Sequence, residues 1–244
     1  MKRKTVKSSE KYRSWVTSKD LVNFEVLEGE SDLFISAKKK LTVQAERLTR
    51  KCRKTIQDHI ARYPRFKDSL QPINKRSSSI PQIVREMLSA SRVANVGPMA
   101  AIAGAVAEYV GKGILDFSSE VIVENGGDVF IRSSQDRIMG IYTGESVLSG
   151  KVALRLTGLE AGLGVCTSSG KIGHSLSFGK ADSVTVISDS APLADAAATA
   201  VGNIVKTPDN INQGIERARE IKGVKGVVII VGKKLGIWGE VEII

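Results

Sequence analysis

The chain has 244 residues, of which 42% are hydrophobic and 25% charged. These values are typical of a globular protein with its own core, and no stretch approaches the ~18 apolar residues of a membrane helix. Two cysteines, Cys52 and Cys166, are too few for a disulfide framework or a thiolate metal cluster. The basic N-terminus continues into polar residues and not into an apolar signal segment, so we expect a cytoplasmic protein.

The net charge of +10 is concentrated at one end of the chain. Residues 1–76 contain 20 lysines and arginines against 9 aspartates and glutamates, whereas residues 77–244 contain 16 against 17. Such a basic segment is either a solvated face or a surface that attracts acidic proteins or nucleic acid. No nucleic-acid-binding module or aromatic platform accompanies it, so nucleic acid is the less favoured partner.

The first third of the chain predicts a hairpin and a long helix. Two strands, 21–27 and 32–37, lie on either side of Gly29. Apolar residues at three- and four-residue spacing then predict one amphipathic helix over 40–63. Prolines and serines predict a linker over 64–79.

The rest of the chain mixes helices with short strands. Pro81 starts one predicted helix, Gly97-Pro98 ends it, and a second helix of very small residues follows over 99–110. Further helices are predicted at 193–205 and 210–221, and strands at 121–123, 129–131, 139–143, 152–156, 164–167, 184–187, 226–231 and 235–244. Consecutive strands favour antiparallel pairing, so we predict an α+β fold with a mixed, largely antiparallel sheet packed by helices.

Asp195 and Thr199 lie in the alanine-rich segment 193–200. A helix places them one turn apart on the same face. A carboxylate and a hydroxyl that converge in this way suit Mg²⁺, which takes oxygen ligands, and the alanines leave room for a substrate. The competing interpretation is that Asp195 caps the helix N-terminus and Thr199 is only buried.

Two polar segments follow predicted strands. In Asn125-Gly126-Gly127-Asp128, Asn-Gly is a hairpin turn signal, yet the glycine amides can also approach a ligand and Asp128 can accept its hydrogen bonds. Thr167-Ser168-Ser169-Gly170 offers hydroxyls for an anion or a ribose. The loop residue His174 is a candidate general acid or base, or an ordinary exposed residue, and Cys166 is a nucleophile only where the surroundings favour its thiolate.

Taken in order, these segments resemble the ApbE family, the Mg²⁺-dependent FAD:protein FMN transferases. The resemblance comprises the small-residue helix start at Gly97 to Gly104, the Asn-x-Gly-Gly-Asp turn at Asn125 to Asp128, the Thr-Ser-Gly loop at Thr167 to Gly170 with His174 downstream, and the Asp-x-x-x-Thr helix at Asp195 to Thr199. Almost end to end, the chain is similar to a branch of short ApbE-like proteins common in anaerobic microbes. The resemblance implies that residues 1–76 belong to the same fold as an ApbE-like nucleotide- and metal-binding core at 77–244.

The same resemblance implies a site. Mg²⁺ would be held by Asp195 and Thr199, and His174 and Asp195 would be the catalytic residues. FAD or FMN would be bound by Ala100, Ala101, Gly104, Asn125, Gly126, Gly127, Asp128, Thr167, Ser168, Ser169 and Gly170. An acceptor or partner protein would dock on the basic N-terminal region, and the oligomeric state stays open, a homo-oligomer included.

One departure from the family pattern limits what the resemblance implies. The transferases continue after the histidine with Asp-Pro and Thr-Gly, whereas His174 is followed by Ser175-Leu176-Ser177-Phe178-Gly179. Two functions therefore stay open. The first is Mg²⁺-dependent transfer of FMN to a cytoplasmic protein. The second is flavin or nucleotide binding without transfer, as an accessory protein of anaerobic sulfur or redox metabolism, for example in homocysteine or cofactor assembly.

Overall fold

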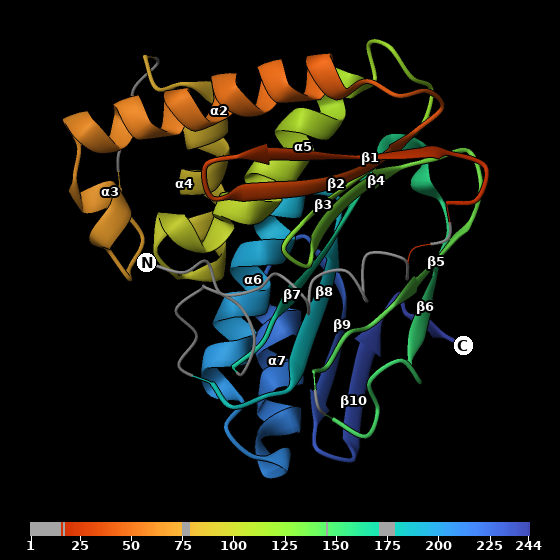
Figure 1. Cartoon of the computed structure of the whole chain (residues 1–244). Helices are drawn as coiled ribbons and strands as arrows, with labels where there is room; N and C mark the ends of the chain where they lie inside the picture. The colour runs from red at the N-terminus through yellow and green to blue at the C-terminus, as the bar shows by residue number, and fades with distance from the viewer. Residues whose placement is uncertain (1–15, 17, 75–78, 145, 171–178) are drawn as a thin grey trace, which may run out of the picture.

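The computed structural model of the chain describes residues 16, 18–74, 79–144, 146–170 and 179–244 (Figure 1). Its centre is an eight-stranded sheet in which every neighbouring pair is antiparallel. In spatial order the strands are β1 (Val22–Glu28), β2 (Ser31–Ala37), β3 (Val121–Asn125), β4 (Asp128–Arg132), β7 (Leu163–Ser168), β8 (Ser183–Ser188), β9 (Val224–Val231) and β10 (Lys234–Gly239). The predicted α+β class and antiparallel sheet are confirmed.

Helices cover one face of this sheet (Figure 1). They are α2 (Thr42–Arg62), α3 (Arg65–Asp68), α4 (Gln82–Ala94), α5 (Ile102–Ile114), α6 (Ala191–Ile204) and α7 (Ile211–Glu220), with short 3₁₀ turns η1 (Pro98–Ala101), η2 (Leu159–Ala161) and η3 (Pro208–Asn210). Strand residues alternate between the two faces. The helix-facing ones, such as Val123, Phe130 and Val184, form the larger core with the alanines of α5 and α6.

A small second sheet covers part of the opposite face. It consists of β5 (Arg137–Gly140), β6 (Ala153–Leu156) and β11 (Glu242–Ile243), in the order β11-β6-β5. Ile131, Val165 and Ile230 of the large sheet pack there against Leu154 and Leu156 in a second core. The central strands are therefore buried on both faces, as in β8, where all six residues are buried, and in β9, where the last six are.

Two elements differ from the sequence predictions. The strand predicted over 235–244 is two strands in different sheets, because the chain bends at Gly239, where φ is +90° and a side chain would strike the Lys225 carbonyl oxygen. The predicted linker 64–79 contains the short helix α3, in which Phe66 is buried. A four-residue helix carries too few periodic positions to be recognised in a sequence.

No single helix in the described ranges is long and apolar enough to cross a membrane. Two consecutive helical segments, Gln82–Ala94 and Pro98–Ile114, reach that length and apolar character only together, and they meet at a bend of 107°.

Candidate functional site

Asp195 projects from the first half of α6 towards the start of α5. Its Oδ2 accepts a hydrogen bond from the Gly104 backbone amide at 2.9 Å. The helix is capped instead by Ser190, whose hydroxyl accepts from the Leu193 amide. The alternative in which Asp195 caps α6 is therefore wrong, since this carboxylate joins two helices.

The close crossing of α5 and α6 explains the small residues of both helices. A side chain at Gly104 would lie 2.3 Å from the Ala191 carbonyl oxygen, a contact that no folded protein tolerates. Ala101 is fully buried, whereas Ala100 is half-buried. Of these three predicted nucleotide-binding residues, Gly104 donates its backbone N–H to Asp195, and Ala100 is the most accessible to solvent.

The turn between β3 and β4 brings Asn125 and Asp128 to the same helix-facing side. Asn125 Nδ2 donates to the Ala103 carbonyl oxygen at 3.0 Å, and Asp128 Oδ1 accepts from the Thr167 amide at 3.2 Å. Gly126 and Gly127 have positive φ angles of +66° and +105°, and nothing lies within 4 Å of where their side chains would begin. The glycines therefore provide the turn geometry and an open surface, although the Gly127 amide is used by Glu124 Oε1.

The hydroxyls of the predicted Thr167-Ser168 pair point to opposite faces of β7. Thr167 Oγ1 hydrogen-bonds Thr185 Oγ1 at 2.9 Å. Ser168 pairs in register with Val184, on the helix side, and its buried Oγ has no hydrogen-bond partner among the described residues. Gly170 is held by its amide to Ala181, and His174 lies outside the described residues.

Cys166 lies opposite Asp128 in the β4–β7 ladder. Its thiol is fully buried and contacts the Ala191 carbonyl oxygen at 3.4 Å. Burial, reinforced by the charges of Asp128 and Asp195, raises the pKa of this thiol well above its usual range. The thiol therefore stays protonated, which argues against the nucleophilic role considered from the sequence.

Asp128 and Asp195 form an acidic pair in a buried setting. Burial raises the pKa of Asp195 to about 7, against the backbone amides of Gly104 and Ala103, although part of the side chain remains accessible. Burial and then the neighbouring Asp195 raise the pKa of Asp128 well above its usual range. No lysine or arginine in the described ranges pairs with either carboxyl group. Two neighbouring carboxyl groups without a cation stay partly protonated. A bound cation would favour ionisation of both.

Thr199 lies one turn beyond Asp195 on α6 and is buried. Within the described part of the chain, no three His, Cys, Asp or Glu side chains are arranged to hold a metal ion. The predicted pair consists of one carboxylate and one hydroxyl from consecutive turns of α6. Such a set leaves coordination positions for substrate oxygens or water.

Glu108 is a residue that the sequence reasoning missed. This buried carboxylate of α5 accepts from the Ala191 amide at 2.7 Å and pairs with Lys112, so it anchors the first turn of α6. The signal was present in the sequence: Glu108 is the single acidic residue in a helix of mostly small and apolar residues. Such a buried charge needs a partner.

Comparison with known proteins assigns the fold and the family. Among solved structures, the flavin transferase ApbE from Vibrio cholerae matches with a TM-score of 0.58 at 10% identity, over 90% of this chain and 96% of that one. The ApbE protein of Thermotoga maritima matches with a TM-score of 0.53 at 14% identity, over 90% and 96% of the two chains. At such identities the likeness concerns the fold.

Sequence relatives are closer. A UPF0280 protein of Methanocaldococcus jannaschii is 42% identical over 203 residues, covering 81% of this chain and 82% of its own length. A UPF0280 protein of Methanococcus vannielii is 43% identical over 214 residues, covering 86% and 83%. The family model described as "AbpE bacteria" matches residues 13–234. The chain therefore belongs to this AbpE family, with the fold of the ApbE flavin transferases and with UPF0280 proteins of methanogens, which are anaerobic archaea, as its relatives.

Proposed function

We propose that the protein binds FAD together with Mg²⁺ and transfers the FMN part to a hydroxyl group of a cytoplasmic protein. The observation that carries the proposal is the buried acidic pair, Asp128 and Asp195, which lies beside the α5–α6 crossing of an ApbE-like fold without a described cationic partner. Ionising both carboxyl groups without a cation nearby is costly to the fold. A function that requires a cation there explains the presence of the pair.

The donor set fits Mg²⁺. Asp195 and Thr199 would hold the ion, since both offer hard oxygen atoms from one face of α6. The buried Ser168 hydroxyl on the same side of the sheet would supply a further oxygen for the ion or for a water bound to it. When bound, the ion would neutralise negative charge on the pyrophosphate of FAD.

The chain's own residues would position the nucleotide. The turn at Asn125 to Asp128 offers an open surface, and Asn125 donates to the carbonyl oxygen of Ala103, three residues after the half-buried Ala100. Ser168 to Gly170 would bind the sugar or phosphates, and His174 would take up a proton. The predicted contribution of Thr167 is not kept, because its hydroxyl bonds Thr185 on the other face of the sheet. In the reaction, the acceptor oxygen bonds to the FMN phosphorus, the bond from that phosphorus to the bridging oxygen breaks, AMP leaves with that oxygen, and the acceptor proton passes to a base.

The test is AMP release from FAD by the purified protein with Mg²⁺, measured by chromatography, together with in-gel fluorescence of flavin bound covalently to proteins of a cell extract. Asp195→Asn should lower both by at least about 100-fold, because it removes several kcal/mol of charge stabilisation. The matched control is Asp189→Asn, a change at an exposed aspartate two residues before α6 that pairs with Lys225. Tight FAD binding without AMP release would rule out the transferase.

The second candidate function is flavin or nucleotide binding without transfer. The observation that favours it is the segment Ser175 to Gly179, which differs from the Asp-Pro and Thr-Gly that follow the histidine in the transferases. In that case the purified protein retains a flavin or another nucleotide, and mass spectrometry of the denatured protein identifies it. Asp195→Asn would then weaken cation-dependent binding without any loss of turnover, since there would be none.

A further inference from the structure

The outward side of α2 is strongly basic. The buried side of the helix carries Ala45, Thr49, Cys52, Ile56 and His59. The opposite side exposes the cations Arg47, Arg50, Lys51, Lys54 and Arg62. Because α2 lies along the outside of the helical layer, this side faces away from the protein (Figure 1).

Several of these cations are not neutralised. Arg50 pairs with Glu28 at 3.2 Å and Lys54 with Asp58 at 2.7 Å. Arg47, Lys51 and Arg62 make no ion pair with any described residue, and neither does the exposed Arg65 just beyond the helix. From residue 47 to residue 62, at about 1.5 Å per residue, the unpaired charges extend over roughly 22 Å.

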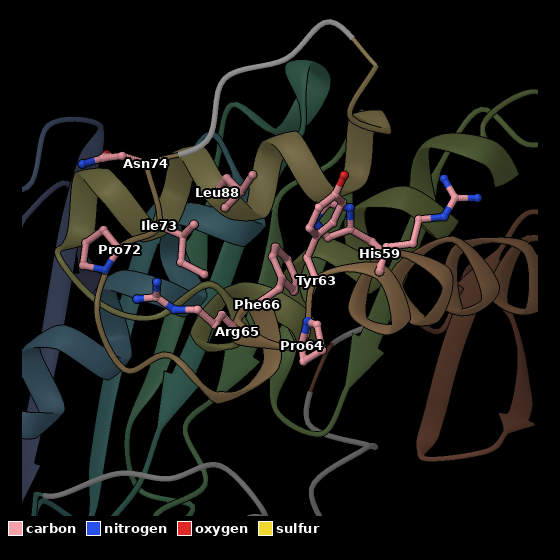
Figure 2. A pocket seen from close by; sticks show the side chains of 10 residues that line it. His59, Tyr63, Pro64, Arg65, Phe66, Pro72, Ile73, Asn74 and Leu88 are labelled. Atoms are coloured by element: carbon pink, nitrogen blue, oxygen red, sulfur yellow. The ribbon is translucent and has the colours of Figure 1, made fainter.

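A cavity of about 460 Å³ lies at the C-terminal end of this basic stripe (Figure 2). Phe66, Ile73 and Leu88 give it an apolar lining, and Arg62 and Arg65 also line it. Figure 2 shows it between α2, α3 and α4, with the rings of Tyr63 and His59 side by side. Its size suits one or two apolar side chains or a small ligand.

We propose that the unpaired cations of α2 and this cavity form one docking surface for an acidic protein segment, whose apolar anchor residue enters the cavity. Charge complementarity selects the acidic segment, and the apolar lining selects a side chain that nucleic acid does not have. Single-stranded nucleic acid would instead need aromatic rings on which successive bases stack, and along this stripe only Tyr63 exposes one in the described residues. The inference rests on the proposed function in one respect: the segment belongs to the protein that receives FMN.

The probe is a fluorescein-labelled peptide of sixteen residues, all glutamate except two leucines four positions apart, with fluorescence anisotropy as the readout. We expect binding to the full chain that weakens at least tenfold between 50 and 200 mM NaCl. The double variants R47Q/K51Q and R62Q/R65Q should each weaken binding about fivefold. Replacing both leucines of the peptide by serine should weaken it about tenfold, or about 1.4 kcal/mol, because no apolar side chain then enters the cavity.

The matched control is K233Q/K234Q, which removes two exposed lysines at the start of β10, away from α2 (Figure 1), and should leave peptide affinity within twofold. The inference would be overturned by no binding, by equal binding of the serine peptide, or by unchanged binding to both R47Q/K51Q and R62Q/R65Q. Tighter binding of a sixteen-nucleotide single-stranded RNA, with loss in the same variants, would overturn it in favour of nucleic acid. FAD binding and AMP release are measured in parallel: normal values with no peptide binding contradict the docking surface alone.

Discussion

At Asp195, a carboxyl group with a pKa raised to about 7 also has a firm structural contact, the Gly104 amide. For an aspartate, a raised folded-state pKa means that the native protein holds a proton which the unfolded chain has released between pH 4 and 7. Its ionisation therefore destabilises the fold progressively as the pH rises through that range. A bound divalent cation would reverse the effect.

This loss of stability on ionisation of Asp195 predicts how the Asp195→Asn variant behaves. Without divalent cations at pH 8, Asp195→Asn should melt at the same temperature as the parent protein or a few degrees higher, because asparagine still accepts from Gly104 but carries no charge. Mg²⁺ or Mn²⁺ should raise the melting temperature of the parent and of Asp189→Asn, but not that of Asp195→Asn. Differential scanning calorimetry at two cation concentrations measures this. An equal cation-dependent increase in all three proteins would show that the cation binds elsewhere.

Glu108 anchors the first turn of α6 through the Ala191 amide. Glu108→Ala leaves the Ala191 amide buried without its acceptor, so we predict a loss of about 2 kcal/mol in the free energy of unfolding. Urea denaturation measures the loss. Lys112→Ala is the control on the same helix: Lys112 is largely exposed, and its removal should cost less than about 1 kcal/mol. Equal losses in both variants would mean that the ion pair, and not the amide contact, matters.

At the scale of elements, the crossing of α5 and α6 depends on backbone contact. Gly104→Ala would place a methyl group 2.3 Å from the Ala191 carbonyl oxygen, so the helices must separate and the bond from Gly104 to Asp195 must lengthen. We predict a loss of about 3 kcal/mol in stability together with weaker cation binding. Gly113→Ala is the control, because its methyl group would meet only the flexible end of Leu48. Cation affinity that is unchanged in Gly104→Ala would contradict the link between this crossing and the site.

Elements whose pattern is long and regular were predictable from the sequence. The helix expected over 40–63 is α2, and the strands expected at 184–187 and 226–231 are β8 and β9. The division of 235–244 between two sheets was not predictable, because it depends on how Gly239 meets Lys225, a contact between distant parts of the chain. Apolar periodicity does not report such contacts.

In the candidate site, too, spacing along the chain was predictable, whereas contacts between distant segments were not. The spacing of Asp195 and Thr199 on one helix was visible in the sequence, and so was the Gly126-Gly127 turn. That Asp195 bonds to Gly104, and that Ser168 and not Thr167 faces the helices, depends on helix crossing and strand register. A shift of register by one residue would exchange the two hydroxyls.

At the scale of the whole molecule, a buried charge cluster connects the two sheets. Arg137 of β5 hydrogen-bonds Glu120, just before β3, at 2.6 Å and also pairs with Asp20, which precedes β1. Burial alone would raise the pKa of Glu120, but hydrogen bonds from Ser133, Lys38 and Arg137 outweigh it and lower the pKa to about 2. The hydrogen bond from Arg137 likewise lowers the pKa of Asp20 well below its usual range.

Acid should therefore weaken the contact between the sheets. For carboxyl groups with lowered folded-state pKa values, the stabilisation is fully present above pH 5 and is lost as the pH falls from about 4.5 towards 2. Glu120→Gln should cost about 2 kcal/mol at pH 7 and make unfolding less dependent on pH in that range. Urea denaturation at pH 7, 4 and 3 checks this. A variant whose stability falls with acid as steeply as that of the parent would contradict the role of Glu120.

We propose that the α5–α6 crossing holds a cation-dependent site that cleaves FAD and passes on FMN. This proposal is tested most directly by incubating the purified protein with FAD and Mg²⁺, with and without a cell extract, and measuring AMP and covalently bound flavin. We predict AMP in proportion to newly flavinylated protein, abolished by EDTA and by Asp195→Asn but kept in Asp189→Asn. Saturable FAD binding without AMP or flavinylated protein in any extract would contradict the claim.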